Sequence, residues 1–268
     1  MKEKGNDIFS KEEELMAQFL KEKNLMYANQ IAAEVHPKNT FYTRYGKRVL
    51  DLIIITPIII LLSPIYLILA LLNLINMGTP IFYKQTRYGY KGKYYDIYKF
   101  RSMKNLYTND GRQLSPNQRL TKYGKLIRKL SLDELPNLIN IFRGEMSIIG
   151  PRGVPVFYME RMTERHKMMS AVRPGLECPR MIEIESQDEI SNYLLTFENN
   201  IWYVENVSLL TDLKMFFCLV KMVFTFKERT KRAGGTSFFV GYDNKGRAIS
   251  MTLAKKLYGE QYLKMKVG

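Results

Sequence analysis

Residues 52–83 contain no charged side chain, and this stretch constrains the fold more than any other part of the sequence. Residues 52–72 are almost entirely Leu, Ile, Ala and Pro, with one Ser, one Thr and one Tyr. A helix of about 20 apolar residues is long enough to cross the roughly 30 Å hydrocarbon core of a bilayer. The stretch therefore predicts that the chain is embedded in a membrane.

Two features of the stretch argue against a simple crossing. Basic residues flank both of its ends, whereas the two sides of a spanning helix normally differ in positive charge. Pro57 and Pro64 lie inside it, and a proline removes a backbone donor and tends to kink or break a helix. We therefore expect residues 41–83 to form a re-entrant helix-break-helix, broken at Ser63 and Pro64, that enters and leaves one leaflet. The flanking residues are Arg44, Lys47, Arg48, Lys84, Arg87, Lys91 and Lys93.

A side chain next to the expected break could form the hydrogen bond that the backbone loses there. Because the bilayer core holds no water, a carbonyl freed by Pro64 needs a partner within the chain, and the adjacent Ser63 hydroxyl is suited to this role. Met1 and Gly268 are then expected on the same, cytoplasmic side of the membrane. An ordinary kinked transmembrane helix is the alternative interpretation.

The charge balance narrows the classes of partner. The 268 residues include 41 Lys and Arg against 26 Asp and Glu, a formal net charge of +15. This favours nucleic acid, an anionic membrane surface or phosphorylated substrates. We expect no nucleic acid partner, because the sequence has no RNP, zinc-finger or helix-turn-helix pattern. Cys178 and Cys218 are too few for a disulfide framework, which fits a catalytic part that faces the reducing cytoplasm.

The remainder of the chain indicates one compact α/β domain, mostly α, without repeats. Short extended segments are expected at residues 80–83 and 94–100, around a turn at 88–92. Four apolar residues have the spacing of a half-buried helix that ends in a cap at Gly144. They are Leu135, Leu138, Ile139 and Phe142.

The C-terminal part contains a second candidate membrane contact. Residues 209–226 mix apolar, aromatic and basic side chains, which predicts an amphipathic helix at the membrane interface. A helix packed on the domain, with its lysines in water, is the alternative. The expected organisation comprises an N-terminal extension (1–40), the membrane anchor (41–83), a catalytic domain (84–187) and a C-terminal amphipathic segment with a tail (188–268).

Adjacent carboxylates at Asp133 and Glu134 begin the predicted helix. A capping box is one interpretation, in which Ser131 and Glu134 each bond the other's backbone amide. That motif does not account for Asp133. Two carboxylates beside the basic Arg128 and Lys129 also suit a site that holds a divalent ion and supplies a nucleophile.

Four ordered blocks of sequence extend this second interpretation. They are residues 78–89, 99–103 (Lys-Phe-Arg-Ser-Met), 126–138 and 144–152. Together they closely resemble the bacterial sugar transferases, the monotopic polyprenyl-phosphate phosphoglycosyl transferases. The resemblance covers roughly residues 42–226, including the apolar anchor with its Ser-Pro pair.

The resemblance implies a two-step reaction. Asp133 would attack the β-phosphorus of a UDP-sugar and displace UMP, and polyprenyl (undecaprenyl) phosphate would then displace Asp133. It also implies that Mg²⁺ binds through Asp133, and that Glu134 orients the metal or nucleophile or assists the lipid phosphate. Basic residues at matched positions are expected to clamp phosphates. They are Lys99, Arg101, Arg128 and Arg152.

The resemblance further implies a place in the cell. Such an enzyme would initiate assembly of an exopolysaccharide, capsule, O-antigen or glycoprotein glycan on the cytoplasmic face of a bacterial inner membrane. Its partners would be membrane lipids and downstream glycosyltransferases. A catalytically inactive scaffold of a glycan-assembly complex is the alternative, and the retained Asp133 and Glu134 argue against it.

The chain departs from the family pattern at a few positions. Gly153 stands where the family usually has a second Pro after Pro-Arg, and Glu145 replaces an Asp. Leu176, Glu177 and Cys178 replace the usual Ile-Thr-Gly after Pro-Gly. We expect these changes to affect recognition of the donor more than the reaction.

Overall fold

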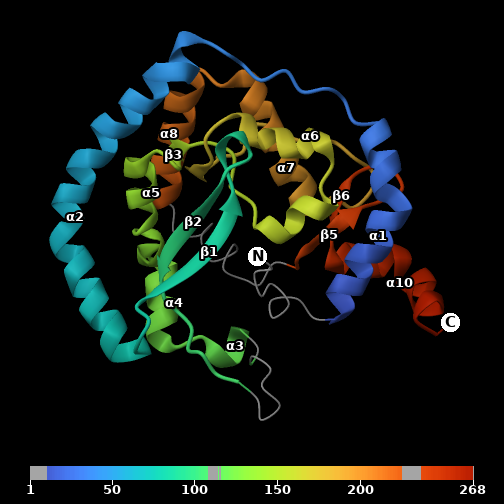
Figure 1. Cartoon of the computed structure of the whole chain (residues 1–268), viewed down its shortest axis with the longest axis horizontal. Helices are drawn as coiled ribbons and strands as arrows, with labels where there is room; N and C mark the ends of the chain where they lie inside the picture. Colours follow the sequence, from blue (N-terminus) through green and yellow to red (C-terminus); the bar gives the residue numbers. More distant parts are fainter. Residues whose placement is uncertain (1–10, 108–113, 115, 225–236, 268) are drawn as a thin grey trace.

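The computed structural model describes residues 11–107, 114, 116–224 and 237–267, and it is mostly helical (Figure 1). The helices are α1 (Lys11–Gln30), α2 (Lys47–Met77), α3 (Pro116–Arg119), α4 (Lys122–Lys129), α5 (Asn137–Arg143), α6 (Glu164–Lys167), α7 (Asn192–Asn206), α8 (Leu209–Phe224) and α10 (Met251–Val267). The strands are β1 (Phe82–Tyr88), β2 (Tyr94–Phe100), β3 (Ser147–Ile149), β4 (Gly175–Glu177), β5 (Phe239–Tyr242) and β6 (Ala248–Ser250). The expected mostly α variety of α/β fold is confirmed.

The strands form three small sheets of two strands each. β1 and β2 make an antiparallel hairpin in which Phe82 faces Phe100 and Tyr88 faces Tyr94. The predicted hairpin is confirmed, although β1 continues to Tyr88, because every residue from Phe82 onward pairs with β2. Lys91 in the turn has a φ of 54°. β3 and β4 pair in parallel, and β5 and β6 pair antiparallel.

α2 is a single curved helix that contains both prolines (Figure 1). With the turn before it, residues Tyr42–Met77, it is long and apolar enough to cross a membrane. The interruption expected at Ser63 and Pro64 is absent, and the helix continues through them. Pro64 leaves the carbonyl of Ile60 without its helical donor, and the Ser63 hydroxyl donates to that carbonyl at 2.8 Å. The substitute bond helps the helix to continue through the proline.

Both ends of α2 are fixed to the same folded domain. Near its start, the Asp51 carboxylate accepts hydrogen bonds from the Ser147 hydroxyl at 3.0 Å and the Ile148 amide at 3.1 Å. Near its end, the side chain of Asn73 donates to the carbonyl of Arg101 at 2.8 Å. Residues between Ile55 and Leu69 on α2 are not buried, so the middle of the helix presents apolar side chains outward.

The main core lies between α2, α5, α7 and the β3–β4 pair. It includes Ile55, Ile141, Tyr203 and Met215, each at most 2 % exposed. Side chains from segments far apart in the sequence fill it, which places the start of the anchor against the centre of the domain. Burial of such apolar area is the main term that stabilises the arrangement.

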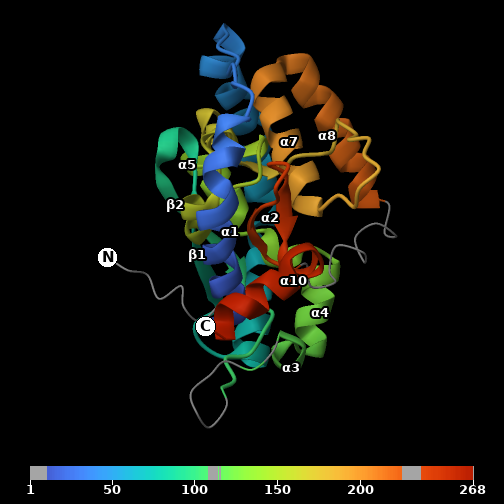
Figure 2. The same ribbon diagram turned by 90° about the vertical axis from the view of Figure 1, so that its right-hand side faces the viewer.

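A second core joins the two ends of the described chain. α1 packs against β5 and α10 through Met16, Leu20, Val240 and Ala254, all completely buried. Figure 1 places this group on the side of the molecule opposite α2, and Figure 2 shows α1 and α10 from that side. The N-terminal extension and the C-terminal tail therefore form one accessory unit.

A buried polar network attaches this accessory unit to the rest of the chain. His166 on α6 contacts the Tyr242 hydroxyl through Nδ1 at 2.7 Å and the Glu198 carboxylate through Nε2 at 2.9 Å. Arg165 forms an ion pair with the same carboxylate at 2.7 Å. Tyr242 belongs to β5 and Glu198 to α7, so the network connects elements that are distant in sequence.

α8 has one buried side and one exposed apolar side. Asp212 is buried and pairs with Lys47 at 2.6 Å, which joins α8 to the first turn of α2. Leu210 and Phe217 are 77 % and 68 % exposed. An amphipathic helix is thus present, whereas its contact with a membrane stays a prediction. The end of the predicted segment, residues 225–226, lies outside the described residues.

Candidate active site

The adjacent carboxylates lie in a short 3-10 turn, Leu132–Glu134, between α4 and α5. Ser131 before it has a left-handed backbone with φ 56°, and its side chain makes no capping hydrogen bond. The capping-box interpretation is therefore wrong. The regular helix begins only at Asn137, after Pro136, because the turn has already redirected the chain. Both carboxylates are left free for other contacts.

The face that α5 buries differs from the face that the sequence predicted. Gly144 adopts the expected left-handed cap, with φ 83°. Leu138 and Ile141 are buried, but Ile139 and Phe142 are 39 % and 50 % exposed. The buried face instead includes polar side chains, among them Asn140, which donates to the carbonyl of Asp96 at 2.7 Å. The spacing of apolar residues did not predict the buried face of α5 correctly, because polar residues also lie on that face.

Asp133 is the buried member of the carboxylate pair, at 8 % exposure. Burial raises the pKa of Asp133 to about 6, with the Glu134 charge adding to the shift while Lys99 and Arg128 oppose it. The one hydrogen bond that lowers its pKa comes from its own backbone amide. A poorly solvated carboxylate is costly, and groups with a perturbed pKa cluster at functional sites.

Glu134 is the paired member. Its Oε1 contacts the ammonium group of Lys99, at the end of β2, and lies 4.0 Å from Nη2 of Arg152. Although burial opposes the charged form, the Lys99 and Arg152 charges hold the pKa of Glu134 below its ordinary value. Glu134 is thus fixed as a carboxylate that holds two cations in place beside Asp133.

Arg128 reaches the site through a close approach of α4. The Thr121 side chain caps α4 by accepting from the Gly124 amide at 2.9 Å. A Cβ at Gly124 would lie 1.8 Å from the carbonyl oxygen of Ser102, so only glycine permits this contact. The Arg128 Nε then donates to the Ser102 hydroxyl at 2.7 Å. Both arginine and serine belong to the predicted blocks, and Ser102 is a positioning contact that the sequence did not single out.

Arg101 is directed to a different place. It is 7 % exposed, and its Nη1 donates to the carbonyl of Pro80 at 2.9 Å. This contact fixes the loop between α2 and β1. Of the four cations predicted to bind phosphate, the structure brings Lys99 and Arg152 to Glu134 and Arg128 within electrostatic reach of Asp133.

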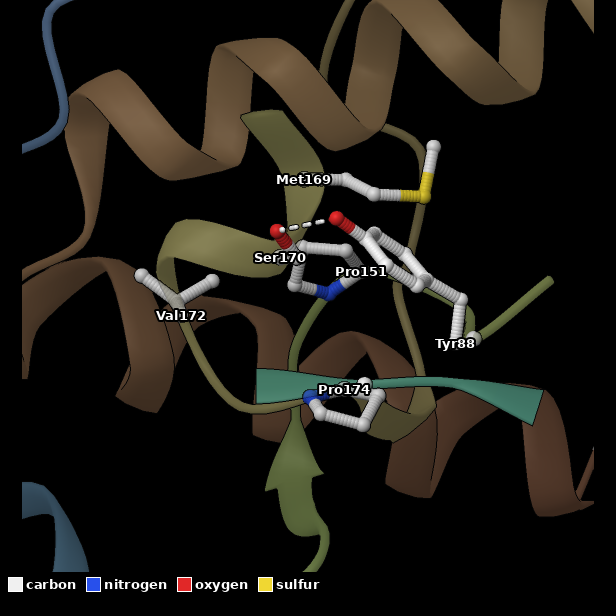
Figure 3. A pocket seen from close by; sticks show the side chains of 8 residues that line it. Tyr88, Pro151, Met169, Ser170, Val172 and Pro174 are labelled. Atoms are coloured by element: carbon white, nitrogen blue, oxygen red, sulfur yellow. Dashed lines mark hydrogen bonds between the residues drawn. The ribbon is translucent and has the colours of Figure 1, made fainter. Parts of the chain in front are cut away.

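The loop after β3 presents Arg152. Its amide hydrogen-bonds the Asn200 side chain at 3.4 Å, and its backbone bridges to Gly175. Behind the loop, a depression too narrow for water is lined by Pro151, Pro174, Tyr88 and Ser170 (Figure 3). These side chains pack the base of the loop, while the Arg152 head remains half exposed.

Arg87 is a site residue that the phosphate-binding prediction missed. Its Nη1 donates to the carbonyl of Gly153 at 2.6 Å, and its charge acts on both Glu134 and Arg152. Burial lowers the pKa of Arg87, and its Nε is buried without a hydrogen-bond partner. The sequence could have identified Arg87 as a site residue, because it lies inside the first matched block, residues 78–89.

The structure around Gly153 leaves no room for a side chain, which explains why this position departs from the family pattern. A Cβ at this position would lie 2.4 Å from the hydroxyl of Tyr95, which is 7 % exposed and has little room to move. Glu145, another departure, accepts a hydrogen bond from Asn140 at 2.8 Å. Burial raises the pKa of Cys178 to about 12, so its thiol belongs to the core. Cys178 and Cys218 are both free.

The carboxylates fit a metal ion that is shared with a substrate. Within the part of the chain that the structure describes, no group of three or more His, Cys, Asp or Glu could hold a metal by itself. Mg²⁺ usually takes one or two protein carboxylates and completes its coordination with phosphates and water. Asp133, whose carboxylate forms no ion pair with a described residue, could provide such a ligand, whereas Glu134 is occupied by Lys99.

Comparison with known proteins agrees with this site. The family described as bacterial sugar transferase matches residues 42–226, which include Asp133, Glu134 and all the cations above. The uncharacterized sugar transferase EpsL of Bacillus subtilis is 37% identical over 66% of this chain and 86% of its own length.

Two further relatives have more specific names. The UDP-glucose:undecaprenyl-phosphate glucose-1-phosphate transferase of Escherichia coli is 35% identical over 66% of this chain. The undecaprenyl-phosphate galactose phosphotransferase of Salmonella typhimurium is 31% identical over 68%. The chain covers only 40% and 41% of these two proteins. The chain belongs to the bacterial sugar transferase family and is a transferase enzyme.

Proposed function

We propose that the chain transfers a sugar 1-phosphate from a UDP-sugar to polyprenyl phosphate through a phospho-sugar bound to Asp133. The observation that carries the proposal is the pairing of a buried carboxylate, Asp133, whose pKa is raised by burial, with Glu134 held between Lys99 and Arg152. The names of the relatives support the acceptor, since several act on undecaprenyl phosphate.

The first displacement follows from the charges of the site. A carboxylate oxygen of Asp133 attacks the phosphorus that carries the sugar, and the bond from that phosphorus to UMP breaks. Poor solvation makes the Asp133 carboxylate a better nucleophile, while Lys99, Arg128 and Arg152 stabilise the negative charge that moves onto the departing phosphate. Mg²⁺ held through Asp133 would add further neutralisation of the diphosphate.

The second displacement regenerates the enzyme. A phosphate oxygen of the lipid attacks the same phosphorus, the bond to Asp133 breaks, and the product is a polyprenyl diphosphate sugar. The two substrates never need to be bound together, so the soluble donor and the membrane lipid can use the same cations in turn. The reaction would start a glycan chain for later glycosyltransferases.

The anchor supports a site at the membrane surface. The Tyr66 hydroxyl of α2 donates to the carbonyl of Leu135, directly after the catalytic turn. Because both ends of α2 pack on one domain, we propose that it enters and leaves a single leaflet of the inner membrane, with the catalytic domain on the cytoplasmic face.

The half-reaction without acceptor tests the chemistry. With donor and Mg²⁺ alone, mass spectrometry is expected to find a sugar phosphate on the peptide that contains Asp133, together with released UMP. Asp133→Asn is expected to fold and to lose UMP release, while Asp188→Asn, at an exposed ion pair, retains it. Normal turnover by Asp133→Asn, with no label on the wild-type peptide, would refute the mechanism.

Cysteine labelling tests the topology. A cysteine placed at Lys38, before α2, is expected to resist a reagent confined to the periplasm. Pro64→Leu restores the helical donor and favours a straight helix, so it is expected to increase labelling. Labelling of the otherwise unchanged chain from the periplasm would show a spanning helix instead.

A further inference from the structure

A hollow of about 250 Å³ lies between the anchor and the catalytic domain. Its walls are Ile54 and Ile58 of α2, Leu138 of α5 and Phe216 and Leu219 of α8, and every side chain that lines it is apolar. It is partly open to the outside. Protein interiors are normally packed with few voids larger than a water molecule, so a space of this size needs an explanation.

The volume suits a hydrocarbon chain. An apolar cavity of about 150 Å³ is known to stay dry and to bind benzene. By that measure this hollow has room for roughly ten carbon atoms, or two five-carbon isoprene units. Water would find no hydrogen-bond partner among the lining side chains, so the hollow suits an apolar ligand better than ordered water.

The position of the hollow connects it to the reaction. α5 supplies Leu138 to its wall, and α5 begins at Asn137, three residues after the turn that ends at Glu134. Asp133 and Leu138 are five residues apart, a distance of at most about 18 Å even for fully extended chain, so a lipid phosphate beside Asp133 has its first isoprene units within reach of the hollow. The opposite wall is the membrane helix itself.

We propose that this hollow binds the isoprene units nearest the phosphate of the polyprenyl phosphate acceptor. The inference rests on the proposed function for the identity of the acceptor. The cations of the site hold the phosphate, and the hollow accepts a single chain beside it. A bulk phospholipid fits less well, because its glycerol and second acyl chain would have to occupy the site together with its phosphate.

A photoreactive polyprenyl phosphate tests the location without requiring catalysis. In nanodiscs that contain the full chain, a diazirine near the phosphate is expected to label α5 and the segment of α8 around Phe216. Unlabelled undecaprenyl phosphate should compete, while an equal amount of phosphatidylglycerol should not. Equal competition by the phospholipid, or labels confined to other segments, would overturn the proposal.

A pair of substitutions on α2 tests whether filling the hollow weakens binding of the acceptor. Ile58→Trp fills the hollow, whereas Ile60→Trp adds the same bulk at a position that is 68 % exposed and outside it. Ile58→Trp is expected to raise the KM for undecaprenyl phosphate about tenfold relative to Ile60→Trp. Tenfold corresponds to about 1.4 kcal/mol, the burial of roughly two methylene groups. Equal KM values in the two variants would show that the acceptor does not use the hollow.

The wild-type half-reaction separates the two proposals. If Asp133 is never labelled but the polyprenyl probe is still captured and competed, the proposed chemistry fails while the binding site stands. If Asp133 is labelled and transfer proceeds but the hollow captures nothing, the chemistry stands and the binding site is wrong.

Discussion

Asn73 on α2 donates its side-chain amide to the main-chain carbonyl of Arg101 at 2.8 Å, which ties the end of the anchor to the strand that leads into the site. Asn73 is completely buried, although it lies in an apolar helix. The bond offsets part of the cost of burying this amide, whose oxygen has no partner, and it holds Arg101, two residues after Lys99, against the end of α2.

Asn73→Leu is expected to lower stability by about 1–3 kcal/mol, because the Arg101 carbonyl loses its buried partner. Asn76→Leu is the matched control, since the Asn76 amide bonds only to Leu72 within the same helix and is exposed. Thermal unfolding in nanodiscs provides the measurement. Equal melting temperatures for the two variants would show that the contact contributes nothing.

The rate of UMP release is expected to rise with pH through a midpoint near 6. Burial raises the pKa of Asp133 to about 6, and only the deprotonated carboxylate can attack. The midpoint is to be measured in single turnovers without acceptor, with donor in excess. A flat profile between pH 5 and pH 8 would contradict Asp133 as the titrating nucleophile.

Asp133 is also expected to reduce stability. Since its folded pKa of about 6 exceeds the ordinary value of 3.8, the folded protein holds an extra proton between these values, and stability falls as pH rises through that window. Asp133→Asn removes this penalty and is expected to gain at most about 3 kcal/mol at pH 8, with the gain disappearing below about pH 4. A destabilised Asn variant would contradict the assignment.

Glu134→Gln is expected to fold but to slow UMP release strongly, by about a hundredfold. The variant loses the charge that holds Lys99 and Arg152. Because the Glu134 charge also raises the pKa of Asp133, the pH midpoint of the remaining activity should move below 6. Glu164→Gln, at an exposed ion pair on α6, is expected to leave both rate and midpoint unchanged.

Gly153 and Tyr95 are expected to behave as a coupled pair. Gly153→Ala places a Cβ 2.4 Å from the Tyr95 hydroxyl, which should lower stability by about 1–3 kcal/mol. Tyr95→Phe removes that oxygen, so the double variant should recover part of the loss. Additive losses in a double-mutant cycle would show that the two side chains do not compete for this space.

The sequence predicted the anchor, the hairpin, the Gly144 cap and the residues around the carboxylates. These features depend on neighbouring residues or on blocks of sequence. It did not predict which face of α5 is buried, because Asn140 turns inward to bond Asp96, a contact across 44 positions. It also failed at Pro64, where the Ser63 hydroxyl keeps the helix continuous.

The candidate site also shows that the sequence does not predict which residues distant in the chain come into contact. Asp133 and Glu134 are adjacent, so their association is evident from the chain itself. Arg101 has the same charge as Arg128 and lies in an equally well matched block, yet it bonds the Pro80 carbonyl instead. Only the three-dimensional path of the loop before β1 decides between these two roles.

In the accessory unit, α1 packs against residues that are synthesised much later. Asn24 of α1 hydrogen-bonds the carbonyl of Tyr242, 218 positions later. A ribosome adding about 5–20 residues per second needs roughly 10–45 s to cover that distance. α1 therefore completes its packing only after the segment that contains Asp133 and Glu134 has been synthesised. A chain whose synthesis stops before β5 would contain Asp133 and Glu134 but would leave the apolar face of α1 without the β5 and α10 residues that cover it.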